Sequence, residues 1–302
     1  MRSFIAALTL AAVAELALAQ LTPPDVTVQT EAVAPGIYML VGRAGNIGVS
    51  TGPDGVFLID DQYAPMTPSI VAALQKLNAG PPRFVLNTHW HGDHTGGNEN
   101  LAKEGSLVIA HDQVRARMSS DQFVAFLQSA VPASPQAALP VVTFNDEISL
   151  HLNGDEIRGR YAPNAHTDGD VFVTFRRANV IHAGDLFFRF YPYIDISSGG
   201  SVPGMIAAVD RILTMADDRT RIIPGHGPIA NRADLVEYRE MLVVTSGRIR
   251  DLVAAGKTVE EVVAAAPNAD YDAKWAWTFI TAERYSRMLY ELIEKELKPD
   301  RT

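Results

Sequence analysis

Four side chains that can bind a metal ion lie within six positions of the chain, at His89, His91, Asp93 and His94. The chain contains no cysteine, so any metal ligand must be histidine, aspartate or glutamate, which are ligands that zinc accepts. In an extended segment His89 and His91 lie on the same side of the backbone and can reach one metal ion. Asp93 and His94, further along the turn, can face a second. Because zinc needs about four ligands, the remaining ones must come from elsewhere in the chain.

A buried strand and a glycine-rich loop must position this motif. Residues 83–86 form a short apolar run typical of such a strand, and residues 98–103 favour a helix after the loop. Three more ligand-type residues, His166, Asp185 and His226, lie just past or beside other predicted buried strands. Each alone is more typical of an ordinary loop residue. Together with the first motif they indicate ligands of one metal centre.

Apolar periodicity predicts the other elements. Strands are expected at residues 37–41, 47–51, 56–59, 107–110, 141–144, 147–152, 156–161, 171–175, 180–184 and 222–223, and helices at 66–77, 111–118, 121–131 and within 233–298. Residues 42–48 are glycine-rich and form either a flap over a pocket or a plain turn. His111 and His151 are predicted to be structural and not to bind metal.

Aromatic side chains surround the expected site in the sequence. They are Trp90 and the five residues Phe187, Phe188, Phe190, Tyr191 and Tyr193. The pattern leaves open whether these side chains line a pocket or pack in the core. Trp275, Trp277 and Phe279 in the tail either cover the site or anchor a helix to the sheet, and the anchor is the favoured interpretation.

The N-terminus has the features of a secretory signal peptide. A basic start precedes the apolar run at residues 4–14, and Ala17-Leu18-Ala19 is a cleavage pattern before Gln20. The prediction is a signal peptide over residues 1–19 and a periplasmic or secreted protein that does not associate with the membrane after cleavage. Residues 20–302 are expected to form a single domain with a helical C-terminal extension over about 232–302. The net charge of −9 argues against a nucleic-acid partner, and the oligomeric state stays open.

The metal-binding residues in their order resemble the metallo-β-lactamase superfamily. The resemblance runs from about Asp25 to Pro228 and includes Asp60 ahead of the first histidine motif. It implies an α/β fold, an αβ/βα four-layer sandwich of two mixed β-sheets with outer helices. It also implies two zinc ions per chain. The first would be held by His89, His91 and His166, the second by Asp93, His94 and His226, with Asp185 between them and Asp60 orienting the motif loop.

The resemblance further implies a zinc-dependent hydrolase in which a metal-bridging hydroxide, aimed by the catalytic Asp93, opens an amide or ester bond of a small molecule. A β-lactam, and with it antibiotic catabolism, or a lactone is the expected substrate. A mononuclear iron persulfide dioxygenase-like oxidoreductase and a glyoxalase II-like thioesterase are the alternatives. Phe188 stands where zinc β-lactamases usually carry a lysine that holds the substrate carboxylate. The sequence therefore predicts slow β-lactam turnover and a preference for an uncharged lactone or ester.

Overall fold

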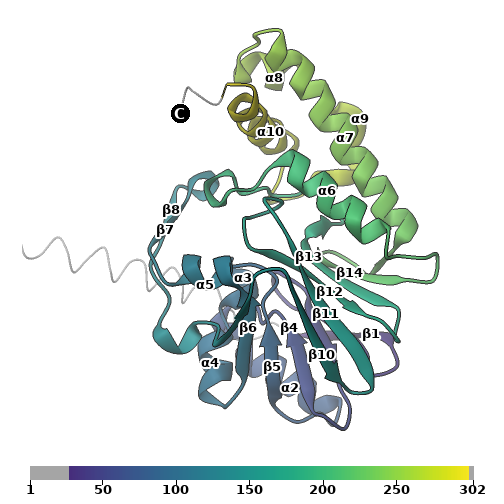
Figure 1. Cartoon of the computed structure of the whole chain (residues 1–302). Coiled ribbons are helices and arrows are strands. Elements are labelled where there is room, and N and C mark those ends of the chain that lie inside the picture. The colour runs from purple at the N-terminus through teal and green to yellow at the C-terminus, as the bar shows by residue number, and fades with distance from the viewer. Residues whose placement is uncertain (1–26, 299–302) are drawn as a thin grey trace, which may run out of the picture.

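Two β-sheets form the centre of the computed structural model, which describes residues 27–298 (Figure 1). The first sheet has the strand order β1-β2-β3-β4-β5-β6-β9, with bounds β1 Gln29–Ala34, β2 Ile37–Val41, β3 Ile47–Ser50, β4 Val56–Ile59, β5 Pro82–Leu86, β6 Leu107–His111 and β9 Val142–Phe144. The second has the order β10-β11-β12-β13-β14-β15, with bounds β10 Glu147–Leu152, β11 Asp155–Ala162, β12 Asp170–Phe175, β13 Val180–Phe188, β14 Arg221–His226 and β15 Ala230–Asn231.

Both sheets are mixed. Strands β1 to β4 are antiparallel, whereas β4, β5, β6 and β9 pair in parallel. In the second sheet β10 to β13 are antiparallel and β14 runs parallel to β13. Parallel neighbours need crossover connections, which helices supply here. The helices are α2 Thr67–Lys76, α3 Gly92–Thr95, α4 Asn98–Lys103, α5 Asp112–Met118, α6 Val202–Leu213, α7 Arg232–Ala254, α8 Val259–Ala265, α9 Ala269–Trp275 and α10 Ala282–Leu297.

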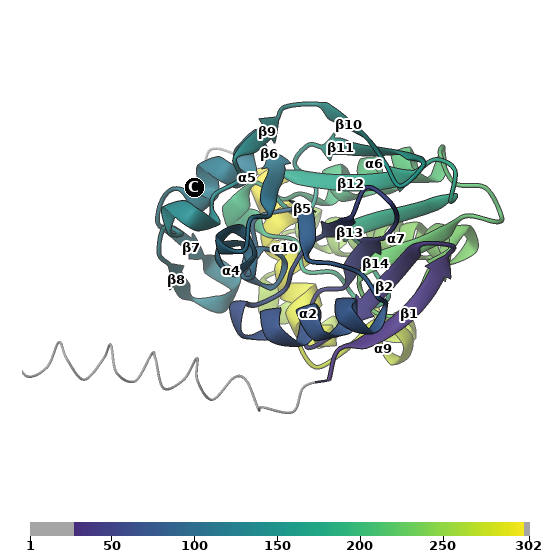
Figure 2. The same ribbon diagram turned by 90° about the horizontal axis from the view of Figure 1, so that it is seen from below.

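Three apolar clusters hold four layers together. Between the sheets, Phe57 and Leu86 of the first sheet belong to one buried cluster with Val173 of the second. On the outer face of the first sheet, α2 buries Ile70 against the strands. On the outer face of the second sheet, α6 and α7 bury a larger cluster that includes Met205 (Figures 1 and 2). The expected αβ/βα sandwich of two mixed sheets is confirmed.

The predicted helix at residues 121–131 is wrong. These residues form a small hairpin, β7 Gln122–Val124 and β8 Ser129–Val131, joined by the 3-10 turn Ala125–Leu127. Gln128 ends the turn in the left-handed region with φ +49°, which a continuing α-helix cannot contain. Phe126 packs against Tyr193 and Phe279, so contacts with distant residues stabilise the hairpin.

The C-terminal helices pack beside the segment that follows β13. Tyr191 stacks on Tyr285 of α10 at 3.9 Å between ring centroids, and its backbone N–H donates to the Trp275 carbonyl at 2.7 Å. No helix within residues 27–298 is long and apolar enough to cross a membrane. The predicted signal peptide lies outside the described residues.

Candidate metal centre

The first histidine motif follows the central strand β5. The chain leaves β5 at Leu86, bends at residues 88–90 and then enters α3, which carries Asp93 and His94. His89 and His94 are buried, whereas Asp93 keeps 19% of its side chain exposed. The two pairs are not fully separated, because the His89 ring centroid lies 4.8 Å from that of His91 and 4.2 Å from that of His94.

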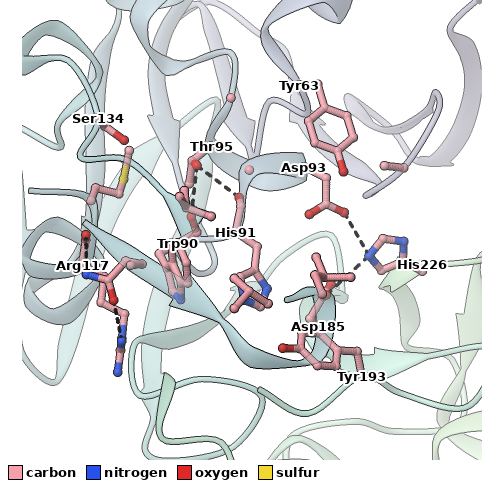
Figure 3. Close-up of a pocket in the computed structure, with 18 of the residues that line it drawn as sticks. Tyr63, Trp90, His91, Asp93, Thr95, Arg117, Ser134, Asp185, Tyr193 and His226 are labelled. Atoms are coloured by element: carbon pink, nitrogen blue, oxygen red, sulfur yellow. Dashed lines mark hydrogen bonds and ion pairs between the residues drawn. The ribbon is translucent and has the colours of Figure 1, made fainter. Parts of the chain in front are cut away.

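Seven side chains from both sheets converge at this point. Three overlapping groups place their ligand atoms within 4.8 Å of one another: His89, His91 and His166; His89, His94 and Asp185; and Asp93, His94 and His226. Figure 3 shows Asp93, Asp185 and His226 facing one another. The structure thus brings together every residue that the sequence suggested as a ligand.

Asp185 lies between the two outer groups. Its Oδ2 is 3.5 Å from His166 Nε2 and 3.4 Å from His226 Nε2, and its Oδ1 is 3.2 Å from His94 Nε2. A tetrahedron of zinc bonds about 2.0–2.1 Å long has edges of about 3.3 Å, close to these separations. One carboxylate can therefore serve both groups.

The hydrogen bonds of the imidazoles show which nitrogens are free to bind a cation. The outer nitrogens are engaged: His94 Nδ1 lies 2.8 Å from Asp60 Oδ2, and His166 Nδ1 lies 2.8 Å from the Tyr193 carbonyl oxygen. The inner His94 Nε2, like Asp185 Oδ1, is buried without any hydrogen-bond partner. Unpaired buried polar atoms are costly, and a cation between them would satisfy both. The donor set and its orientation fit zinc.

Asp60 holds the motif loop from below. This fully buried carboxylate accepts from the Thr88 backbone N–H at 2.7 Å and from the Thr88 hydroxyl at 2.8 Å, in addition to its contact with His94. Asp60, the residue expected to orient the motif loop, thus fixes both that loop and the imidazole of His94.

Sequence reasoning missed Asp195, which has the same role for His91. Its Oδ2 lies 3.0 Å from His91 Nε2, and its Oδ1 accepts from the backbone N–H groups of Ser197 and Ser198. In the sequence, Asp195-x-Ser197-Ser198 is only a helix-capping pattern. The contact with His91 spans 104 residues of chain, and no local signal indicates it.

The pKa values of His166 and His94 are shifted in opposite directions. Burial lowers the pKa of His166 to about 4, so its inner nitrogen is unprotonated at neutral pH. Burial also lowers the pKa of His94, but Asp185, Asp93 and Asp60 outweigh it and leave that pKa well above the ordinary value. A cation bound at His94 would therefore displace a proton.

Glycines allow the backbone to approach the cluster closely. A Cβ atom on Gly225 would lie 2.0 Å from Asp185 Oδ1, and one on Gly45 would lie 2.6 Å from His94 Cε1. Asn46 fixes the glycine-rich loop at residues 42–46 by donating to the carbonyls of Pro224 and Gly227. At its Asn46 end this segment is tied to the second sheet.

A cavity of about 670 Å³ opens beside the metal-binding residues. Of the aromatic side chains left open by the sequence, Trp90, Phe188, Phe190 and Tyr193 line it, whereas Phe187 and Tyr191 are buried in the core.

The tail contributes to the cavity as well. Trp275 is buried against Tyr238 and anchors the tail, as expected. The same expectation is incomplete for Trp277 and Phe279, which line the cavity.

The cations near the cavity are mostly neutralised. Arg189, which follows Phe188 in the chain, does not line the cavity and pairs with Asp234 at 2.6 Å. Arg117 at the far end pairs through two nitrogens with Asp168, each at 2.7 Å. Arg43 is exposed at the mouth, where an ion pair contributes only about 0–1 kcal/mol.

The other three histidines lie apart from the three groups. His111 caps α5 by accepting from Gln113 N and stacks on Tyr161, and His151 is exposed on β10. His182 is buried in β13 with its Nε2 unpaired. The prediction that His111 and His151 are not ligands agrees with these positions.

Comparison with known proteins points to one family. A family model described as the metallo-beta-lactamase superfamily matches residues 40–226. The chain is 22% identical over 170 residues to the metallo-beta-lactamase type 2 of Bacteroides fragilis, covering 55% of this chain and 61% of that protein. It is 26% identical over 169 residues to a hydroxyacylglutathione hydrolase of Nitrosococcus oceani, covering 56% and 57%. The chain thus spans about three-fifths of the length of these relatives.

Solved structures share the fold. A metallo-beta-lactamase from Pontibacter korlensis superposes with a TM-score of 0.58 at 17% identity, covering 72% of this chain and 99% of that one. The stereoselective inverting sec-alkylsulfatase Pisa1 from Pseudomonas sp. gives a TM-score of 0.66 at 19% identity, covering 88% and 50%. At these identities the likeness concerns the fold alone.

Proposed function

The chain belongs to the metallo-beta-lactamase superfamily, and on that premise we propose that it is an exported two-zinc hydrolase that opens an uncharged ester or lactone. One observation carries the proposal. Asp185 lies within 3.8 Å of imidazoles from both outer groups, so seven ligands are available where one metal ion would use only part of them. Two zinc ions, when bound, supply an activated water and polarise a carbonyl oxygen at neutral pH.

The residues would divide the work between two sides of the site. His89, His91 and His166 would hold one zinc, and Asp93, His94 and His226 the other. Asp93 is the carboxylate of the cluster that is most exposed to the cavity, at 19% against 6% for Asp185. Its Oδ2 lies 3.5 Å from both His94 Nε2 and His226 Nε2 and would hold the zinc, so its other oxygen, Oδ1, is left to accept a proton from the attacking water and to pass it to the leaving oxygen.

Tyr63 lies above Asp93 with its hydroxyl directed toward the carboxylate (Figure 3). Burial, followed by the charge of Asp93, raises the pKa of Tyr63 to about 12. The phenol therefore keeps its proton at neutral pH and can donate a hydrogen bond to substrate in the cavity. This donor would stabilise negative charge on a reacting oxygen.

The cavity favours a substrate without a carboxylate. Phe188 lies parallel to His226, with 5.1 Å between ring centroids, and so presents an apolar face beside the cluster. Arg189 and Arg117 are paired with carboxylates, and Arg43 is exposed to water. A β-lactam would gain little binding energy for its carboxylate, so both KM and kcat should suffer.

Metal analysis of the purified protein tests the proposal first. About two zinc ions per chain is the expected result, and one iron ion would instead support the persulfide dioxygenase-like alternative. The second test compares a cephalosporin, a penem, an acyl lactone and an acylglutathione thioester. We expect the lactone to be the preferred substrate. Cephalosporin turnover above about 10 s⁻¹ would contradict the substrate argument, and preference for the thioester would favour the function named for the Nitrosococcus relative.

A further inference from the structure

The cavity continues well beyond the metal-binding residues. In Figure 3, Asp93, Asp185 and His226 gather at one end, while Arg117 and Ser134 lie at the other, past Trp90. We propose that this extension, here called the side arm, holds a long unbranched acyl chain and makes the protein selective for medium- and long-chain acyl esters or lactones. The inference rests on the proposed function and names the substrate class of the same site.

The walls of the side arm are mostly apolar, although Glu99, Ser120, Gln122 and Ser134 also line the cavity. The apolar and aromatic residues are Trp90, Met118, Val124, Leu127, Val131, Pro132, Pro135, Ala138, Tyr193 and Phe279. At the far end Arg117 is held by Asp168 and also donates to Gln122 Oε1 at 2.9 Å. Its charge is therefore matched within the protein, and residues 27–298 place no free cation at the end of the arm for a second carboxylate or a phosphate. Such a surface suits a chain of methylene groups.

Two segments that are far apart in the sequence meet at one wall of the side arm. The β7–β8 hairpin supplies Phe126, whose ring centroid is 4.9 Å from that of Tyr193 and 5.7 Å from that of Phe279. Phe279 lies 5.5 Å from Trp277, which continues the aromatic surface towards His226. Tyr193, Trp277 and Phe279 thus give the cavity an aromatic face, and Phe126, which does not itself line the cavity, packs against two of them and holds them in place.

Two exposed apolar residues of the hairpin differ in one respect. Leu127 is 50% exposed and lines the cavity, whereas Phe123 is 53% exposed and does not. An acyl chain bound in the arm would cover an apolar side chain at the cavity edge and remove its surface from water. The pair therefore offers a test residue and a matched control on the same short hairpin.

The length of the acyl chain should change the rate strongly. Each methylene moved from water into the arm should raise kcat/KM by up to about fourfold, from about 0.8 kcal/mol per CH₂. A cavity of about 670 Å³ is within the range of about 300–1,000 Å³ that encloses drug-sized ligands, so the gain should stop once the arm is full.

The experiment measures kcat/KM of the zinc-loaded protein for p-nitrophenyl esters of 2 to 14 carbons. We expect a rise with chain length to a plateau. Leu127→Asp should lower the ratio of long-chain to short-chain kcat/KM by about tenfold or more, because a charge then borders the arm. Phe123→Asp should leave that ratio unchanged. A flat profile in the unmodified protein, or an equal loss in both variants, would overturn the inference.

A binding measurement separates this inference from the proposed function. Alkyl methyl ketones of increasing length cannot be hydrolysed, and two of the three tryptophans, Trp90 and Trp277, line the cavity and report their binding by fluorescence. Affinity that rises with ketone length without any ester or lactone hydrolysis would support the side arm and refute the hydrolase. Hydrolysis with length-independent ketone binding would do the reverse.

Discussion

Replacing Asp195 by asparagine should weaken metal binding without removing any ligand. His91 presents Nδ1 to the cluster, 2.9 Å from His166 Nε2 and 3.1 Å from His89 Nε2. Its proton must therefore reside on Nε2, where Asp195 Oδ2 accepts it at 3.0 Å. The carboxylate thus selects the tautomer that leaves the inner nitrogen able to bind a cation.

The size of the effect follows from which atom the amide would present. The Asp195 Oδ1 position accepts from two backbone N–H groups, those of Ser197 and Ser198, so the amide oxygen should stay there. The amide NH₂ then faces His91 Nε2, and two donors meet. His91 must either turn away or move its proton to Nδ1. Loss of such an outer partner costs about 10- to 100-fold in metal affinity, or about 1.4–2.7 kcal/mol.

Competition with a fluorescent zinc chelator measures this affinity. Asp168→Asn is the control, because it removes a carboxylate that accepts two hydrogen bonds from Arg117 and contacts no metal-binding histidine. We expect the control to bind zinc as the unmodified protein does. Zinc affinity of Asp195→Asn within about twofold of the unmodified protein, or an equal loss in Asp168→Asn, would refute the tautomer argument.

Three further changes test other parts of the molecule. Asp185→Ala should lower the zinc content below two per chain and reduce hydrolysis by more than about 100-fold while circular dichroism stays unchanged, because a direct contact exceeds an outer one; two tightly bound zinc ions in this variant would disprove the central role of the carboxylate. Gly225→Ala should destabilise the fold by about 1–3 kcal/mol and lower the zinc content, because its Cβ would lie 2.0 Å from Asp185 Oδ1. Gly247→Ala in α7 is the control: no atom lies within 4 Å of its Cβ, so this variant should raise the melting temperature. N-terminal sequencing of protein from the natural host should begin at or near Gln20, and a mature protein that retains Met1 would contradict export.

The sequence indicated the candidate metal ligands better than it indicated the residues that hold those ligands in position. His89, His91, Asp93 and His94 are close in the chain, so their spacing and the strand-to-helix turn are enough to indicate a metal site. Asp195 is different, because its contact with His91 depends on where the segment after β13 returns to the first sheet. A single sequence contains no periodicity that encodes such a return.

The misassigned hairpin has a similar cause. Residues 121–131 have apolar spacing compatible with a helix, and helix propensity gave no reason to reject it. What decides their structure is the contact of Phe126 with Tyr193 and Phe279, which come from the segment after β13 and from the C-terminal extension. The regular sandwich follows from local patterns, whereas the cavity walls depend on residues more than 60 positions apart.

The division of the seven metal-binding side chains between the two sheets affects how the protein matures. His89, His91, Asp93 and His94 follow β5 of the first sheet, and His166, Asp185 and His226 belong to the second. Neither half carries four ligands arranged around one ion, so a nascent chain cannot capture zinc firmly until both halves have docked. Zinc bound by both halves would then cross-link them. Zinc uptake would consequently act as the final, locking step of folding, and a chain matured in a zinc-poor medium would be the one that proteases remove first.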